Sequence, residues 1–231
     1  MAKHIGIVGC SAEGAALCYR TICLEAPQFM GTYFHPEISM HTHSLGDYMG
    51  PIQTGDWPTV AALMLSSVTN LKQAGAEFVV CPDNTIHQAF PYIVERSELP
   101  WLHIAEVIAQ KAEDDKYKNL AILGTKYLME GPVYSGILEK HRIECRIPQV
   151  TDREKIDQII FTELVMGIFG EKSRLYFNQV IQQLKEEGCD AVVLGCTEIP
   201  LLVNADDCPL PTLDSTRLLA RAAIDYSLQQ R

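Results

Sequence analysis

One sequence pattern occurs twice in the chain, and it constrains the fold more than any other feature. The stretch AGAEFVVCPDNT at 74–85 resembles EGCDAVVLGCTE at 187–198. Aligning the glycine before each apolar run sets an offset of 113 residues, which also places Asp83 opposite Cys196. The repeat predicts two similar lobes, each with one functional turn after a buried strand.

Strand-like and helix-like runs alternate along the rest of the chain. Strands are expected at 5–9, 77–81, 119–124 and 190–195, and helices at 11–26, 56–75, 132–143, 152–169, 171–188 and 214–230. Segment 99–114 is expected to begin as a strand and become a helix. Such alternation is typical of parallel sheets buried on both faces. We therefore predict an α/β protein of two pseudo-symmetric lobes, each a mainly parallel sheet flanked by helices. The N-terminal lobe is predicted to contain 1–98 and the closing helix 214–231, and the second lobe 99–213.

Four polar turns follow the predicted strands. They are expected at Gly9–Ser11, Asp83–Thr85, Gly124–Lys126 and Cys196–Glu198. Ligands of open parallel sheets bind beyond the carboxyl ends of the strands. The sequence therefore predicts an active site in a cleft between the two lobes. Segment 35–55 is punctuated by glycine, and we predict a loop that lines this site.

The charge balance excludes several classes of partner. The formal net charge is −10, from 19 basic and 29 acidic side chains, with no Lys/Arg cluster. Nucleic acid and anionic membrane surfaces are therefore not expected partners. No apolar run approaches the roughly 18 residues of a membrane helix, and the N-terminus lacks a signal-peptide pattern. We expect a cytoplasmic protein.

The eight cysteines are expected to be mostly small buried side chains. The chain is too long and too rich in core residues for a disulfide scaffold. No CxxC pair occurs, and His41 and His43 have no evident third ligand, so no metal site is predicted.

Both polar turns after the repeated strands carry motifs of a known family. GCTEIPLL at 195–202 resembles the second signature of the aspartate/glutamate racemase family, and DNTIH at 83–87 stands where the family has its first. The resemblance continues through TGDW (54–57), LPWLHIAE (99–106), LGTKYLMEG (123–131) and IIFTELVMGIFGEKSR (159–174). The wider superfamily includes aspartate, glutamate and hydantoin racemases, maleate isomerase and arylmalonate decarboxylase. The resemblance implies a two-lobed fold, a homodimer and catalysis without pyridoxal phosphate or any other cofactor.

The chain departs from the family at the first catalytic position. Two-cysteine racemases have a cysteine at each signature turn, whereas this chain has Asp83 at the first and Cys196 at the second. Cys81 lies two residues earlier, about 6–7 Å back along the strand, and is interpreted as a core residue. A second departure is VGCSAEG (8–14), which replaces the usual Gly-Gly-Met turn.

A third departure concerns the substrate side chain. Some acidic-amino-acid racemases of this type carry a basic residue in the helix that here contains Met166 and Ile168. These two side chains are apolar, and the nearby Lys172 and Arg174 are interpreted as solvated. The sequence therefore does not identify a group that would hold an acidic side chain.

Racemisation without a cofactor needs an acid/base on each face of the α-carbon. Asp83 and Cys196 are the candidate pair. A free aspartate has a pKa near 4 and a free thiol near 8.5, so the resting pair is expected to be a carboxylate and a neutral thiol. The sequence thus predicts strong directional asymmetry, or loss of racemisation altogether.

The other candidate site residues are polar groups of the same four turns. Ser11, Asn84, Thr85, Thr125 and Thr197 are candidates for binding a substrate carboxylate, with ordinary turn chemistry as the alternative. His87 and Glu198 are candidates for supporting roles. His87 is expected either to pair with a carboxylate or to make a structural hydrogen bond, and Glu198 either to orient a donor or to cap a helix. Tyr48 is not included among the site residues.

Three readings of the function stay open. The first is an amino-acid racemase or epimerase of the aspartate/glutamate type that uses Asp83 and Cys196. The second is a related isomerase, decarboxylase or lyase acting on a carboxylic acid. The third is a catalytically silent protein that binds an amino acid. The first two predict loss of activity in Cys196→Ala, and the third predicts ligand binding that survives this substitution.

Overall fold

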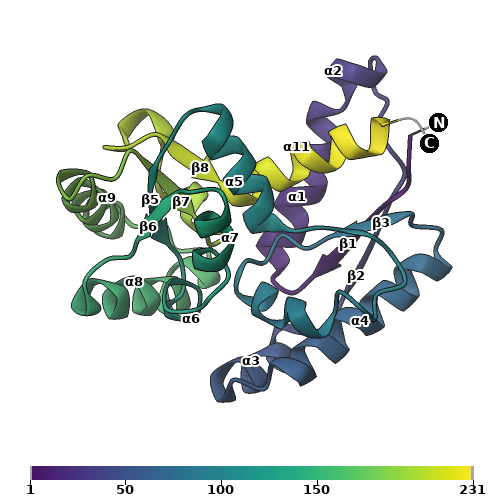
Figure 1. The fold of residues 1–231 in the computed structure, drawn as a ribbon, viewed down its shortest axis with the longest axis horizontal. Helices are drawn as coiled ribbons and strands as arrows, with labels where there is room; N and C mark the ends of the chain where they lie inside the picture. Colours follow the sequence, from purple (N-terminus) through teal and green to yellow (C-terminus); the bar gives the residue numbers. More distant parts are fainter. Residues whose placement is uncertain (1, 230–231) are drawn as a thin grey trace. The chain divides into compact units, whose positions relative to one another are not determined.

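The computed structural model describes residues 2–229, which divide into two compact units. The first unit contains the chain up to Val107 and from Thr216 onward, and the second runs from Ile108 to Ser215. Helices α5 (Ile104–Asp114) and α11 (Ser215–Leu228) contain the two boundaries (Figure 1). Among the helices of residues 2–229, none is both long and apolar enough to cross a membrane.

The first unit is built on a four-stranded parallel sheet within the described residues. Its order is β2-β1-β3-β4, so β1 and β3 are the central strands. The strands are β1 (Ile5–Gly9), β2 (Ile38–Thr42), β3 (Phe78–Val80) and β4 (Trp101–Leu102). Because β4 pairs with β3, the segment after residue 98 still belongs to the first unit, whereas the sequence alone places a lobe boundary there.

Helices cover both faces of this sheet (Figure 1). Ile5 and Ile7 pack against apolar side chains of α1 (Ala12–Glu25) and α11, including Ile22 and Leu219. On the other face, Gly6 lies close to Leu71 of α4 (Trp57–Gln73). Side chains of a strand alternate between faces, so β1 contributes to both layers of the core.

The second unit repeats this arrangement within its own described residues. Its four parallel strands have the order β6-β5-β7-β8. They are β5 (Asn119–Leu123), β6 (Glu144–Arg146), β7 (Ala191–Leu194) and β8 (Thr212–Asp214). Each third strand in chain order, β3 or β7, thus lies between the first and the fourth. The predicted α/β fold of two similar units with parallel sheets is confirmed.

The core of the second unit lies between its sheet and two long helices. Leu123 and Val192 of the sheet share one apolar cluster with Ile159 of α8 (Val150–Thr162) and Phe177 of α9 (Glu171–Glu186). Burial of such side chains on both elements is the main source of stability for this layer. Cys196 packs against the edge of the same cluster.

Shorter elements connect these layers. They are α2 (Pro27–Met30), α3 (Leu45–Thr54), η1 (Thr85–Tyr92), α6 (Lys126–Met129), α7 (Ser135–Lys140), η2 (Leu164–Met166), α10 (Ile199–Leu202) and η3 (Ala205–Asp207), where η marks a 3-10 helix.

Segment 35–55 is not the predicted loop. It forms β2, which pairs with β1 from Ile38 to Thr42, and then α3. Tyr48 and Ile52 lie one helical turn apart on α3, and both are buried. The predicted helix at 152–169 is also shorter, because α8 ends at Thr162 and Gly167 adopts a left-handed conformation with φ of 74°.

Candidate active site

Asp83 joins the carboxyl ends of the two central strands of the first sheet. It lies three residues after the end of β3, and its two carboxylate oxygens accept hydrogen bonds from the main-chain N–H groups of Cys10 and Ser11, both at 3.1 Å. Ser11 is the N-cap of α1, where its hydroxyl accepts a bond from Gly14 N at 3.2 Å. Backbone donors at the positive end of a helix stabilise a carboxylate in its charged form.

Cys81 is a core residue, as its place before the turn indicates. Its side chain is fully buried, and its thiol donates to the main-chain carbonyl of Asp83 at 3.8 Å. Burial first, and then the charge of Asp83, raise the pKa of Cys81 well above its ordinary value. The thiol is therefore neutral at physiological pH and is not a nucleophile or base.

His87 holds the backbone of the same turn. Its Nδ1 lies 3.0 Å from the main-chain carbonyl of Asp83, and its Nε2 accepts a long hydrogen bond of 3.5 Å from Ile104 N. This pattern places the ring proton on Nδ1, which donates to the carbonyl. Burial lowers the pKa of His87 to about 4, so the ring is neutral at pH 7. The observed contact is with the backbone and not with a carboxylate.

Asn84 and Thr85 complete the turn of the first unit. Asn84 is 3% exposed, and its main-chain carbonyl oxygen accepts a hydrogen bond from the main-chain N–H of His87 at 3.1 Å. Thr85 is the first residue of η1 and is partly exposed. The structure thus places Asp83, Asn84 and Thr85 on one turn, beside the Ser11 turn.

Cys196 occupies the corresponding position after β7 in the second unit. Its thiol donates a hydrogen bond to Glu198 Oε2, with a sulfur–oxygen distance of 2.9 Å. Glu198 and Thr197 are each 3% exposed, whereas Cys196 is partly exposed. A buried carboxylate in contact with a thiol can accept the thiol proton, which is the chemistry that a catalytic cysteine needs.

Gly195 brings the Cys196 turn close to the neighbouring strand. Its N–H donates to Leu123 O of β5 at 2.7 Å. A Cβ at this position would lie 2.8 Å from the same oxygen and 2.5 Å from Leu128 Cδ2, so no larger residue fits. This close packing fixes the path of the chain after β7 and therefore the position of the Cys196 backbone.

Thr125 follows β5, the strand that pairs with β7. It is the N-cap of α6, and its hydroxyl accepts a hydrogen bond from Leu128 N at 3.3 Å. Thr125 and Cys196 are therefore placed at the carboxyl ends of adjacent strands. The site residues thus form one group in each unit, Ser11, Asp83, Asn84, Thr85 and His87 in the first and Thr125, Cys196, Thr197 and Glu198 in the second.

Two contacts of the site were not predicted from the sequence. The first is the pair of hydrogen bonds from the main-chain N–H groups of Cys10 and Ser11 to Asp83. No sequence pattern indicates such bonds, because every non-proline residue has a main-chain N–H donor. The Cys196–Glu198 bond had a weak signal, a carboxylate two residues after the cysteine.

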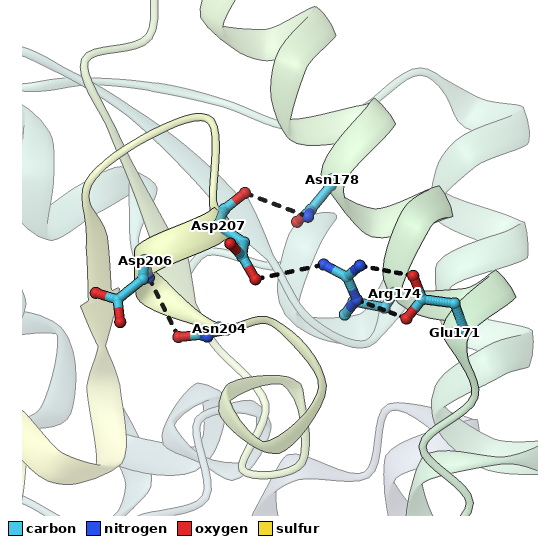
Figure 2. Close-up of polar contacts among 6 residues, drawn as sticks. All are labelled: Glu171, Arg174, Asn178, Asn204, Asp206 and Asp207. Carbon is cyan, nitrogen blue, oxygen red and sulfur yellow. Dashed lines mark hydrogen bonds and ion pairs between the residues drawn. The ribbon is translucent and has the colours of Figure 1, made fainter.

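Arg174 is neutralised by its neighbours in the second unit, as Figure 2 shows. Its guanidinium donates to both carboxylate oxygens of Glu171, at 2.6 and 2.8 Å, and Asp207 lies 3.8 Å away. Around this group, Asn178 donates to the main chain of Asp207 at 3.4 Å, and Asp206 N donates to Asn204 Oδ1 at 3.2 Å. Arg174 is therefore engaged in a local surface ion pair.

The fold and the two turns define a class of protein. It is an α/β protein made of two structurally equivalent units, each with polar residues at the carboxyl end of its central strands. The chain belongs to the Asp/Glu/hydantoin racemase family, whose model matches residues 6–223.

Individual relatives agree with this assignment. A Yersinia pestis crystal structure, provisionally assigned as an Asp/Glu racemase, is 38% identical, covers 98% of this chain and 100% of its own, and has a TM-score of 0.90. An aspartate racemase homologue from Pyrococcus horikoshii OT3 is 26% identical over 99% of this chain and 100% of its own, with a TM-score of 0.86. The broad specificity amino-acid racemase RacX of Bacillus subtilis is 22% identical over 71% of each chain. The family membership supports an amino-acid racemase, an isomerase that acts on a small molecule.

Proposed function

We propose that the protein is an amino-acid racemase or epimerase that works without pyridoxal phosphate or metal, with Asp83 and Cys196 as its two acid/bases. The observation that carries the proposal is the contact between the Cys196 thiol and the buried Glu198 carboxylate. Family membership supplies the reaction class. The proposal also includes a homodimer, from the resemblance alone, and a cytoplasmic location, from the sequence features given above.

The positions of Asp83 and Cys196 in their own units support their pairing. Each follows the third strand of its sheet, after β3 or β7, and the sequence offset between them is the offset of the repeat. In this proposal the substrate lies with one face of its α-carbon toward each residue.

In one direction, the Asp83 carboxylate takes the α-proton and the Cys196 thiol gives its proton to the opposite face. The products of this step are the inverted amino acid, a protonated Asp83 and a Cys196 thiolate. Asp83 then loses its proton to water, and the thiolate regains one. In this reset, Glu198 serves as the local proton carrier, because its carboxylate already accepts the thiol hydrogen bond.

In the other direction, Cys196 must begin as a thiolate and Asp83 as an acid. Glu198 can take the thiol proton, but Asp83 is stabilised in its charged form by two backbone donors. Enantiomers have equal free energies in water, so kcat/KM must be the same for both directions. The asymmetry is therefore expected in kcat and KM separately.

The substrate carboxylate needs donors, because negative charge builds on it as the α-proton leaves. Asn84, Thr85, Thr125 and Thr197 are proposed to supply them. Ser11 is proposed to contribute through its hydroxyl, because its N–H is bonded to Asp83.

A second candidate function is favoured by the hydrogen bonds of Asp83. If the Cys10 and Ser11 N–H groups keep this carboxylate as a structural link, Cys196 with Glu198 is the only acid/base pair of the proposed site. One acid/base suits an isomerase, decarboxylase or lyase acting on a carboxylic acid, because such reactions protonate a carbanion from a single face.

Chiral chromatography separates the candidates. The protein is incubated with single enantiomers of acidic and neutral amino acids, and separately with substituted malonates and unsaturated diacids. Appearance of the opposite enantiomer supports the racemase. Products from the diacids with no inversion of any amino acid support the second candidate.

A further inference from the structure

Tyr48 has an unusual position for a polar side chain. It lies on α3 of the first unit with none of its surface exposed, and its hydroxyl has no hydrogen-bond partner among the described residues. A buried O–H group without an acceptor is unfavourable, and native proteins keep few of them. Such a group is expected to find its partner in another state of the protein, for instance when a ligand is bound.

A hydrogen-bond network joins β2 to α4, the helix that packs beside α3. Asn70 donates from Nδ2 to Ser66 O at 3.0 Å and to His41 Nε2 at 3.1 Å, so His41 carries its proton on Nδ1. That proton is donated to Ser67 Oγ at 3.0 Å, and Ser67 in turn donates to Leu63 O at 3.3 Å.

The ring of Tyr48 contacts His43, which itself lies next to this network. The two ring centroids are 6.4 Å apart in an edge-on arrangement, and His43 Nε2 lies 3.1 Å from Ser66 Oγ. His41 stands edge-on to His43 at 5.1 Å. Ser67 of this network lies close enough to the Tyr48 hydroxyl to act against the rise in its pKa, but the hydroxyl makes no hydrogen bond of normal geometry with any described residue.

Tyr48 lies at the same edge of the sheet as the Asp83 turn, because its ring contacts His43, which directly follows β2, and β2 pairs with β1 up to Gly9 and Thr42. Burial, followed by the electrostatic influence of Cys81, Cys10 and Asp83, raises the pKa of Tyr48 above its ordinary value. The phenol therefore remains a hydrogen-bond donor over the whole physiological pH range. The Asp83 oxygens accept bonds from Cys10 N and Ser11 N, and Tyr48 does not bond to them.

We propose that the Tyr48 hydroxyl donates a hydrogen bond to the carboxylate of the ligand that binds beside Asp83. The inference rests on the proposed function for the place of the ligand, and it adds a ligand-binding residue from α3. A ligand carboxylate near Asp83 is repelled by the Asp83 charge, and a neutral O–H donor offsets this repulsion without neutralising Asp83.

The test compares wild type with Tyr48→Phe, which removes only the hydroxyl oxygen. Binding is measured by calorimetry and by the shift in Tm. The probes are L- and D-aspartate, L- and D-glutamate, L- and D-alanine, and methylmalonate. We expect the variant to bind the preferred probe about tenfold more weakly, while its Tm without probe is equal to or higher than that of wild type.

Tyr134→Phe is the matched control for stability. Tyr134 is also buried, at 2% exposed, but its hydroxyl interacts with Ser215 in the second unit. We expect this control to lower the Tm without probe, because it removes a satisfied hydrogen bond.

Three results would overturn the inference: unchanged affinity in Tyr48→Phe, a Tm lowered as in Tyr134→Phe, or no binding of any probe by wild type. The second would mean that the hydroxyl has a structural partner such as an ordered water. Because binding is measured without turnover, a wild type that binds a probe but inverts none refutes the racemase proposal and leaves the Tyr48 inference standing.

Discussion

The Cys196 thiol donates its hydrogen bond to Glu198, 2.9 Å away, and the Glu198 side chain is almost completely buried. A carboxylate in this position orients the thiol and can accept its proton.

Glu198→Gln is predicted to lower kcat on the order of 10²-fold, because the amide cannot accept the thiol proton. The amide oxygen can still accept a hydrogen bond, so the Tm is expected to change little. Steady-state kinetics with each enantiomer measures the effect. Glu187→Gln, at an exposed position of the same unit, is the control. Equal kcat values in the two variants would remove Glu198 from the mechanism.

Cys196→Ala is predicted to abolish inversion, with kcat reduced by at least about 10³-fold, because it removes the acid for one face of the α-carbon. The matched control is Cys208→Ala, a second partly exposed thiol that packs against the same core cluster. Chiral chromatography follows both variants. Ligand binding with inversion in Cys196→Ala would contradict the two-base account.

Asp83→Asn is predicted to lower stability as well as activity. The amide nitrogen would face the N–H of Cys10 or Ser11, where a carboxylate oxygen now accepts. Losing one such bond and placing two donors together costs about 1–3 kcal/mol of the free energy of unfolding. Urea denaturation measures this loss. Asp206→Asn, at an exposed position, should show neither effect, and a wild-type-like Asp83→Asn would refute the link between β1 and β3.

The first unit is predicted to become less stable as the pH is lowered, because His87 is buried in its neutral form. Its folded-state pKa of about 4 lies below the ordinary value of 6.5. Between these two pH values, His87 is protonated in the unfolded chain and neutral in the folded protein. The stabilisation by neutral His87 is thus present above pH 6.5 and is lost as the pH falls toward 4, by about 2 kcal/mol between pH 7 and pH 5. Denaturation curves at several pH values test this. His87→Gln should lack this component, and an equal pH slope in the variant would contradict it.

Much of the fold could be predicted from the repeat. The strands now labelled β1, β3, β5 and β7 are the apolar, β-rich centres of the two sheets, and a fully buried strand has a clear sequence pattern. The edge strand β2 was missed because its sequence, ISMHT, contains few apolar residues and its side chains are only partly buried or exposed. Helix α3 was missed because its glycines and proline are typical of loops.

The sequence could predict which residues belong to the site but not which groups they contact. The offset between the two copies pointed to Asp83 and Cys196, because equivalent strands end at equivalent turns. The partners of these groups depend on which strands become neighbours, and sequence spacing does not contain that information. The structure supplies the Cys10 and Ser11 N–H groups for Asp83, and the carboxylate of Glu198 for Cys196.

The most direct measurement is deuterium exchange at the α-carbon in D2O, followed by proton NMR and chiral chromatography. Wild type, Cys196→Ala and Asp83→Asn are each incubated with single enantiomers. The two-base account predicts exchange with inversion in wild type, and no inversion in either variant. In the variants, each remaining base should exchange only the enantiomer whose α-proton faces it. Absence of exchange in wild type across acidic and neutral amino acids would contradict the racemase account.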